Sequence, residues 1–203
     1  MDIRIMDTLD SEKVAKIHIE SIDAGFISSL GLRFVKALYK RICLSKKGFV
    51  YVADDKGDIK GFIAGTEDVN KMYKEVLLRG GFLFVIILIR KVFSLSALKR
   101  IFQTLFYPAK VEKEFCKAEI LSVGVKGDAR GKGVGSMLME SALNEFRKRD
   151  VAMIKALTHD INAASNHYYQ KQGYQLKGTV KHHENTLNIY CIELDQNGEN
   201  KDE

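Results

Sequence analysis

The arrangement of apolar and polar segments predicts an α/β fold class, which some schemes call α+β. Segments with the short apolar pattern of strands are interspersed with segments whose apolar residues recur at helical spacing. The order is β-α-α-β-β, then an insertion, then β-α-β-α-β-β. With 203 residues, 46% of them apolar and 29% charged, the chain has the composition of one ordinary globular core. We therefore expect one domain over residues 1–195 and a polar tail over residues 196–203.

The first five elements lie in the N-terminal third of the chain. Residues 2–7 predict a short strand, and residues 11–22 predict a helix with Ser11 as its N-cap. A second helix is predicted over residues 30–44, where apolar residues recur at helical spacing. Residues 49–65 predict two strands around a polar, glycine-containing turn.

Six further elements follow the insertion. The patterns predict a strand, a helix, a buried strand, a helix and a pair of strands over residues 115–127, 133–149, 151–159, 162–172, 174–183 and 186–194, respectively. The second of these helices is expected to end at Gly173, because glycine readily adopts the left-handed conformation that often follows a helix.

The cysteines and the N-terminus bear on location and metals. Cys43, Cys116 and Cys191 are an odd number and form no CxxC pair, so we expect neither a disulfide framework nor a zinc site. Reduced thiols fit a cytoplasmic protein. The N-terminal residues contain no apolar stretch typical of a signal peptide, which also favours a cytoplasmic location. We expect no metal cofactor.

The positive charge is concentrated in the insertion. The net charge is +6, and residues 69–113 alone hold nine Lys or Arg and two Glu. This segment is also rich in phenylalanine and apolar residues. Nucleic-acid binding is not expected, because the cations lie in an apolar segment rather than along a polar face.

A glycine-rich loop, ARGKGVGS, covers Ala129 to Ser136 between a predicted strand and a predicted helix. A helix N-terminus presents unpaired N–H groups and binds phosphates, and glycines let the backbone approach the anion. Arg130 and Lys132 add positive charge. The loop therefore suits a diphosphate, although a tight turn with solvated cations is an alternative. It matches neither the Walker A spacing nor a complete GxGxxG fingerprint.

Two motifs resemble those of the GNAT N-acetyltransferase superfamily. Residues 130–135, RGKGVG, match the R/Q-x-x-G-x-G loop that binds acetyl-CoA in that superfamily. Residues 162–174, NAASNHYYQKQGY, resemble its second CoA motif, although Ser165 stands where alanine is common. The resemblance is specific over residues 117–194. Over residues 1–66 it is limited to the expected order of elements.

The resemblance implies a fold, an activity and a cosubstrate. The fold would be a mixed, mostly antiparallel twisted sheet with helices on both faces, carrying a helical insertion between the third and fourth strands. The protein would transfer an acetyl group from acetyl-CoA to a primary amine of an unidentified acceptor by direct attack in a ternary complex. Acetyl-CoA would contact Val123, Gly124, Val125, Arg130, Gly131, Lys132, Gly133, Val134, Gly135, Ser136, Asn162 and Tyr169.

The resemblance also implies two catalytic residues. Glu119 aligns with a glutamate that serves in some relatives as the base for the acceptor amine, and the alternatives are a charge at the sheet edge or a group that binds the acceptor. Tyr169 holds the position of the acid that protonates the leaving thiolate, and packing against the cofactor is its alternative. The backbone N–H groups around Gly124 would polarise the thioester carbonyl.

Residues 69–113 leave three interpretations open. Two helices there would form a lid on the same domain or on the second subunit of a homodimer. They would alternatively bind a membrane surface through cations beside an apolar face, or line a pocket for a phosphate-bearing acceptor. A non-catalytic acyl-CoA-binding module is the alternative to an enzyme.

Overall fold

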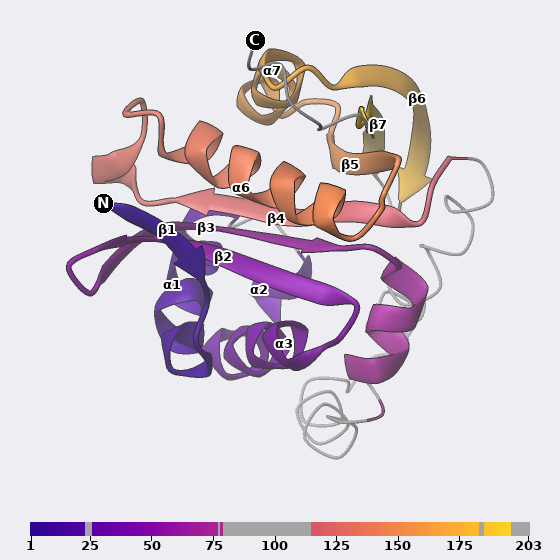
Figure 1. The fold of residues 1–203 in the computed structure, drawn as a ribbon. Helices are drawn as coiled ribbons and strands as arrows, with labels where there is room; N and C mark the ends of the chain where they lie inside the picture. The colour runs from indigo at the N-terminus through magenta and orange to yellow at the C-terminus, as the bar shows by residue number, and fades with distance from the viewer. Residues whose placement is uncertain (23–25, 77, 79–114, 183–184, 196–203) are drawn as a thin grey trace, which may run out of the picture.

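The computed structural model describes residues 1–22, 26–76, 78, 115–182 and 185–195. Within these residues, seven strands form one sheet, and helices lie on both of its faces (Figure 1). The predicted fold class is confirmed, and the elements predicted outside the insertion follow one another in the predicted order. The short helix α2 (Phe26–Ser29) was not predicted. The strands are β1 (Asp2–Ile5), β2 (Gly48–Asp55), β3 (Asp58–Thr66), β4 (Ala118–Val125), β5 (Met153–His159), β6 (Gln175–His182) and β7 (Asn185–Glu193).

The strand order across the sheet is β1-β2-β3-β4-β5-β7-β6. Neighbouring strands are antiparallel everywhere except between β4 and β5, which are parallel. A parallel pair needs a crossover connection, and the helix between these two strands supplies it. The single parallel pair therefore joins an antiparallel half made of β1–β4 to another made of β5–β7.

One face of the sheet is covered by helices from the N-terminal part of the chain. These are α1 (Ser11–Ser21), α2 (Phe26–Ser29) and α3 (Leu32–Leu44), and residues 69–76 form another helix. Helices α1 and α3 each bury one apolar stripe, and these stripes pack on buried side chains of β2 and β3. This cluster is the core of the N-terminal half.

The opposite face is covered by α6 (Val134–Lys148) and α7 (Ala163–Lys171) (Figure 1). Helix α6 buries Val134, Leu138, Met139, Ala142 and Phe146, which pack against residues of β3, β4 and β5. Gly173 follows α7 with a φ of +86°, as its left-handed role after a helix predicts. Because α6 packs across strands of both halves, it helps to hold them together.

The N-terminus of α1 differs from the prediction in one detail. Ser11 is the first residue of the helix rather than its N-cap, which is Asp10. A 3-10 turn, η1 (Thr8–Asp10), precedes the helix, and its own cap is Asp7, whose side chain accepts a hydrogen bond from the Leu9 amide at 2.8 Å. The Ser11 hydroxyl instead donates to the Thr8 carbonyl oxygen.

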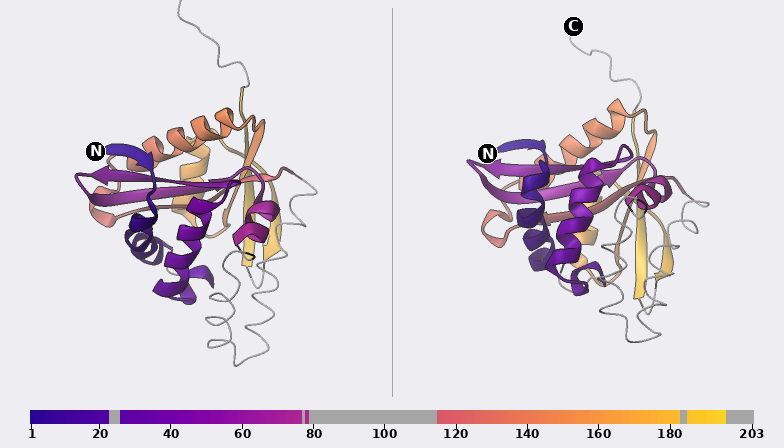
Figure 2. Two further views of the ribbon diagram at one scale, coloured as in Figure 1. Left: turned by 60° about the horizontal axis from the view of Figure 1, so that its bottom comes forward. Right: turned by 90° about the horizontal axis from the view of Figure 1, so that it is seen from below.

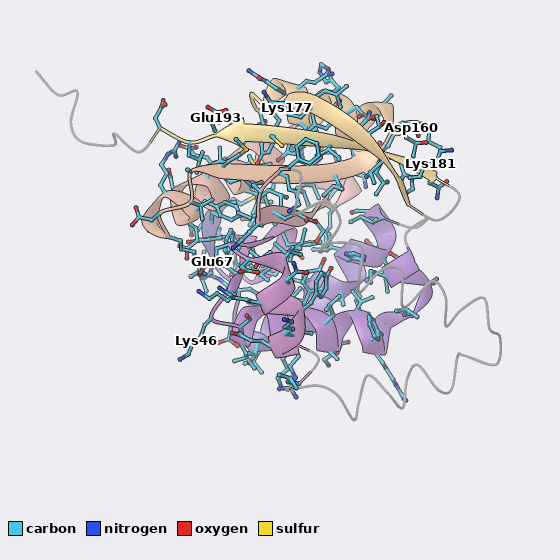
Figure 3. All side chains as sticks on the ribbon, turned by 90° about the vertical axis from the view of Figure 1, so that its right-hand side faces the viewer. Lys46, Glu67, Asp160, Lys177, Lys181 and Glu193 are labelled. Atoms are coloured by element: carbon cyan, nitrogen blue, oxygen red, sulfur yellow. The ribbon has the colours of Figure 1, made fainter. Side chains whose placement is uncertain are left out.

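Strand β6 forms one edge of the sheet and is protected by charge. Lys177 and Lys181 lie on this strand and are exposed, as Figure 3 shows. Charged side chains on an edge strand disfavour pairing with other chains.

The insertion between β3 and β4 is described only where it begins and ends. The two helices predicted within residues 79–110 lie outside the described residues. In the part of the chain that the structure describes, no helix has the length and apolar character needed to cross a bilayer.

Candidate functional site

Strands β4 and β5 separate halfway along β4. Their parallel pairing includes Ala118 with Ile154, Glu119 with Lys155, and Ile120 with Ala156. Beyond these pairs, β4 continues to Val125 and β5 continues to His159. The far strands β6 and β7, drawn in yellow, run across the direction of the N-terminal strands (Figure 2). The backbone edges of β4 and β5 beyond Ile120 and Ala156 are therefore available to pair with an extended ligand.

A bulge in β4 marks the point of separation. In the pairing of β3 with β4, Ala64 faces Ser122 and Gly65 faces Ile120, so Leu121 is the extra residue. A bulge interrupts the ladder and changes the direction of the side chains that follow. Leu121 packs against the cluster beneath α1 and α3, whereas Ile120 belongs to the cluster beneath α6.

Glu119 lies beside the bulge and is mostly buried. Its side chain retains 16% of its exposure, and its Oε2 atom lies 3.5 Å from Nζ of Lys155. The Lys155 side chain is fully buried and donates a hydrogen bond to the carbonyl oxygen of Cys116. Burial raises the pKa of Glu119, and the positive charge of Lys155 opposes that rise.

Val123, Gly124 and Val125 form the separated end of β4. The two valines are partly buried against the α6 cluster. A Cβ atom on Gly124 would lie 2.6 Å from Cε1 of Phe62, so the strand passes too close to this ring for any larger residue. The valine side chains thus pack in the core, as expected, while the backbone of the same residues lies beyond the end of the pairing with β5.

The glycine-rich loop follows β4 after one short turn. That 3-10 turn, η2 (Gly127–Ala129), ends at the first residue of the loop, and Nε of Arg130 donates to the Val125 carbonyl oxygen at 3.0 Å. Gly131 and Gly133 have φ angles of +73° and +82°, in the left-handed region that favours glycine. Gly133 is the N-cap of α6, and no atom lies within 4 Å of a Cβ built on either glycine.

The amino end of α6 presents backbone N–H groups from this loop. The bond that opens the helix runs from the Met137 amide to the Gly133 carbonyl oxygen at 3.1 Å, so the amides before Met137 point out of the helix end. Val134 is buried, whereas Lys132 and Ser136 are exposed. Open space, outward amides and nearby cations together fit a diphosphate group.

Helix α7 supplies Tyr169, which is buried. Its ring stacks with Tyr190 and packs edge-on against Tyr168 and Tyr174. Within the described residues, no group hydrogen-bonds its hydroxyl. Burial raises its pKa, and the negative charge of Glu119 raises it further, which places the two residues within electrostatic reach of each other.

Tyr168 and Asn162 have local roles that the structure makes visible. The Tyr168 hydroxyl donates to the Gly135 carbonyl oxygen at 2.7 Å, and so fastens α7 to the amino end of α6. Asn162 is the N-cap of α7, and its side chain accepts from the Ser165 amide at 3.0 Å. No role for Tyr168 could be predicted from the sequence, because its partner lies 33 positions away along the chain.

Sequence reasoning also missed a buried polar chain on the other face. Nδ1 of His18 lies 2.7 Å from the Tyr39 hydroxyl, which lies 2.7 Å from Oγ of Ser122. Nε2 of His18 is buried with no hydrogen-bond partner among the described residues, and burial lowers the pKa of His18 to about 4. This series of hydrogen bonds reaches Ser122, the residue that follows Leu121 of the bulge. Each member comes from a different element, so no local sequence signal predicts it.

Within the described ranges, no three His, Cys, Asp or Glu side chains are grouped so that they could hold a metal ion.

A family model matches most of the chain. The model of the acetyltransferase (GNAT) family matches residues 20–174, which include β4, the glycine-rich loop and α7. The chain belongs to the GNAT family. The expectation of an acyltransferase is thereby confirmed, and the resemblance noted in the sequence is confirmed as family membership.

Solved structures agree with the GNAT fold. The ribosomal-protein-S18-alanine N-acetyltransferase from Escherichia coli is 14% identical, with a TM-score of 0.61, and the match covers 98% of this chain and 97% of that chain. The ribosomal-protein-alanine N-acetyltransferase from Brucella melitensis is 18% identical, with a TM-score of 0.62, and the match covers 96% and 100%, respectively.

A third solved structure contains a ligand. It is yncA from Salmonella typhimurium with its cofactor acetyl-CoA, which is 17% identical, with a TM-score of 0.60, and the match covers 97% of this chain and 95% of that chain. These identities establish the fold alone. A search of curated proteins found no match.

Proposed function

We propose that this GNAT protein transfers an acetyl group from acetyl-CoA to a primary amine by direct attack in a ternary complex. The observation that carries the proposal is the separation of β4 from β5 at Glu119 and Ile120. The loop suited to a diphosphate follows the separated end of β4, and the buried Tyr169 belongs to α7, which packs against β5. A thioester carried by a long extended arm fits this arrangement of anion site, strand edge and proton donors.

The cofactor-binding residues follow from the loop and the strand edge. The amides of residues 133–136 and the cations Arg130 and Lys132 would hold the diphosphate, while Gly131 gives the backbone its left-handed turn. The edge of β4 from Val123 to Val125 would pair with the pantetheine arm. Asn162 would contact the same arm while it caps α7. Bound there, acetyl-CoA supplies the activated acyl group.

Glu119 is the proposed base. An acceptor amine arrives as an ammonium group and must lose a proton before it attacks. Glu119 would take that proton, so that the nitrogen lone pair forms the C–N bond while the C–S bond breaks. Its position beside the bulge places it where the strands separate.

Tyr169 is the proposed acid. Because burial raises its pKa, its hydroxyl keeps its proton near neutral pH. In the described part of the chain, no residue hydrogen-bonds this hydroxyl. It would donate that proton to the departing thiolate. The nitrogen loses its second proton as the amide forms, and that proton restores the Tyr169 hydroxyl. Glu119 releases its own proton to solvent.

The proposal is tested by calorimetric titration with acetyl-CoA. We expect the unmodified protein to bind acetyl-CoA. In an Arg130→Ala, Gly133→Asp double variant, we expect the affinity to be lower by at least about tenfold, because the variant loses a positive charge and gains a negative charge that repels the diphosphate. A Gly127→Ala variant is the matched control, because this glycine has an ordinary φ and open space around it. Absence of binding by the folded, unmodified protein would contradict the proposal.

Transfer is tested by release of free thiol from acetyl-CoA with a panel of primary amines. The panel contains a polyamine, an amino sugar, an aminoglycoside and peptides that begin with alanine, because two structural neighbours are named as alanine N-acetyltransferases of ribosomal proteins. We expect at least one amine to be acetylated. Tight binding of acetyl-CoA without transfer to any amine would instead favour a non-catalytic acyl-CoA-binding module.

A further inference from the structure

Lys155 is a fully buried lysine where the parallel pairing of β4 and β5 ends. Its side chain has 0% exposure, and its ammonium donates a hydrogen bond to the carbonyl oxygen of Cys116. A buried ammonium group is costly unless an opposite charge and hydrogen bonds compensate for the loss of water. The reaction proposed above gives this residue no role.

Glu119 is the acidic group that meets this ammonium. The two residues are direct partners in the parallel register, and Oε2 of Glu119 lies 3.5 Å from Nζ of Lys155. Glu119 keeps 16% of its exposure and Lys155 none, so the carboxylate side chain reaches solvent whereas the ammonium does not. Within the described residues, no donor hydrogen-bonds Oε1 of Glu119. Oε2 is therefore paired with the ammonium, and Oε1 has no hydrogen-bond donor among the described residues.

The other titratable groups near Glu119 are uncharged at neutral pH. Tyr73 comes from the helix of residues 69–76, Tyr169 from α7 and Cys116 from the chain just before β4. Burial raises the pKa of both phenols, and the neighbouring Cys191 thiol together with burial raises the pKa of the Cys116 thiol. Among the described residues, Lys155 is thus the charged group that faces the carboxylate.

We propose that Lys155 is a positioning residue for acetyl transfer, which keeps Glu119 ionised and holds Oε2 so that Oε1 faces the acceptor amine. This inference rests on the proposed role of Glu119 as the base. Without the ammonium, burial would act alone on the carboxyl group and favour its protonated form, which cannot accept a proton. Lys155 itself neither gains nor loses a proton during the reaction.

A direct test is a pH titration of the Glu119 carboxyl group by NMR, in protein labelled with carbon-13 at glutamate carboxyls. A Glu119→Gln variant assigns the signal. In Lys155→Met, whose unbranched side chain is one atom shorter and carries no charge, we expect the midpoint to move to higher pH by about one to three pH units. The acidic limb of the kcat/KM profile, measured with acetyl-CoA and the fastest amine of the panel, should move in parallel.

Two further variants separate the charge from packing. Lys155→Gln removes the charge but retains a donor for the Cys116 carbonyl oxygen, so it should move the midpoint in the same direction even if Lys155→Met does not fold. Lys155→Arg keeps the charge and should leave the midpoint near that of the unmodified protein. Thermal unfolding of each variant establishes that it is folded.

The outcomes distinguish this inference from the function on which it rests. An unchanged Glu119 midpoint in the folded variants that lack the charge would overturn the inference. A midpoint that moves together with the rate profile supports both proposals. A midpoint that moves while the rate profile stays constant supports the Glu119–Lys155 pair and removes Glu119 from the role of base.

Discussion

Substitution of the two adjacent tyrosines of α7 by phenylalanine should have different kinetic effects. Tyr169 packs among three aromatic rings and has no hydroxyl partner in the described residues, so Tyr169→Phe keeps the ring packing and removes only the hydroxyl group. We expect kcat to fall by about 100-fold, the lower end of what general acid catalysis contributes, with no change in acetyl-CoA affinity. Steady-state kinetics and calorimetry measure the two quantities.

Tyr168→Phe is the matched control. It removes the hydroxyl that donates to the Gly135 carbonyl oxygen and leaves Tyr169 in place. We expect weaker acetyl-CoA binding, because the amino end of α6 loses its contact with α7, and a kcat near that of the unmodified protein. An equal loss of kcat in both variants would contradict the assignment of Tyr169 as the acid.

The buried His18 should make the folded protein less stable at acidic pH. Burial lowers its pKa from 6.5 to about 4, so the unfolded chain binds a proton at a higher pH than the folded protein does. Above pH 6.5, where His18 is neutral in both states, the free energy of unfolding keeps its full value. As the pH falls from 6.5 toward 4, protonation of the unfolded chain lowers it by about 3 kcal/mol. Denaturant unfolding at several pH values measures it.

The control for this prediction is His18→Asn, whose amide can replace Nδ1 beside Tyr39 but does not titrate. Carboxylates titrate in both proteins, so the difference between the two pH profiles isolates the histidine. A difference that stays constant between pH 6.5 and 4 would show that His18 does not cause the slope.

At the scale of elements, the turn from β4 into α6 depends on the left-handed Gly133. Its φ of +82° strains any other residue, although open space surrounds a Cβ built there. We expect Gly133→Ala to lower the free energy of unfolding by about 1–2 kcal/mol and to weaken acetyl-CoA binding. Gly127→Ala, with an ordinary φ, should change neither. Thermal unfolding and calorimetry compare the two variants.

Most helices, strands and turns could be predicted from the sequence, because the patterns that indicate them involve residues close together along the chain. The apolar stripe of α6 and the turn at Gly173 need only neighbouring residues to be recognised. The bulge at Leu121 was not predicted, because it depends on how β3 pairs with β4. The same holds for Lys155, whose contact with Glu119 depends on the parallel register of β4 and β5. The motifs indicated the loop and Tyr169, and the partners of Glu119 and Tyr168 required the fold.

At the scale of the whole molecule, the two halves of the sheet are joined by a short ladder. Ala118, Glu119 and Ile120 pair with β5, whereas the antiparallel ladders on both sides extend along most of their strands. Additional cohesion comes from α6, which packs on residues of both halves. A ligand that pairs with the separated edges would therefore bridge the halves where the protein's own hydrogen bonds end.

This arrangement predicts a local pattern of hydrogen exchange. The amides of residues 121–125 and 157–159 that point between β4 and β5 should exchange faster than those of the paired residues 118–120. Acetyl-CoA at 100 times its dissociation constant should slow them by up to about 100-fold, if opening requires its release. In the Arg130→Ala, Gly133→Asp double variant at the same concentration, exchange should stay fast. Slowing confined to the loop at residues 130–136 would mean that the ligand does not lie between the strands.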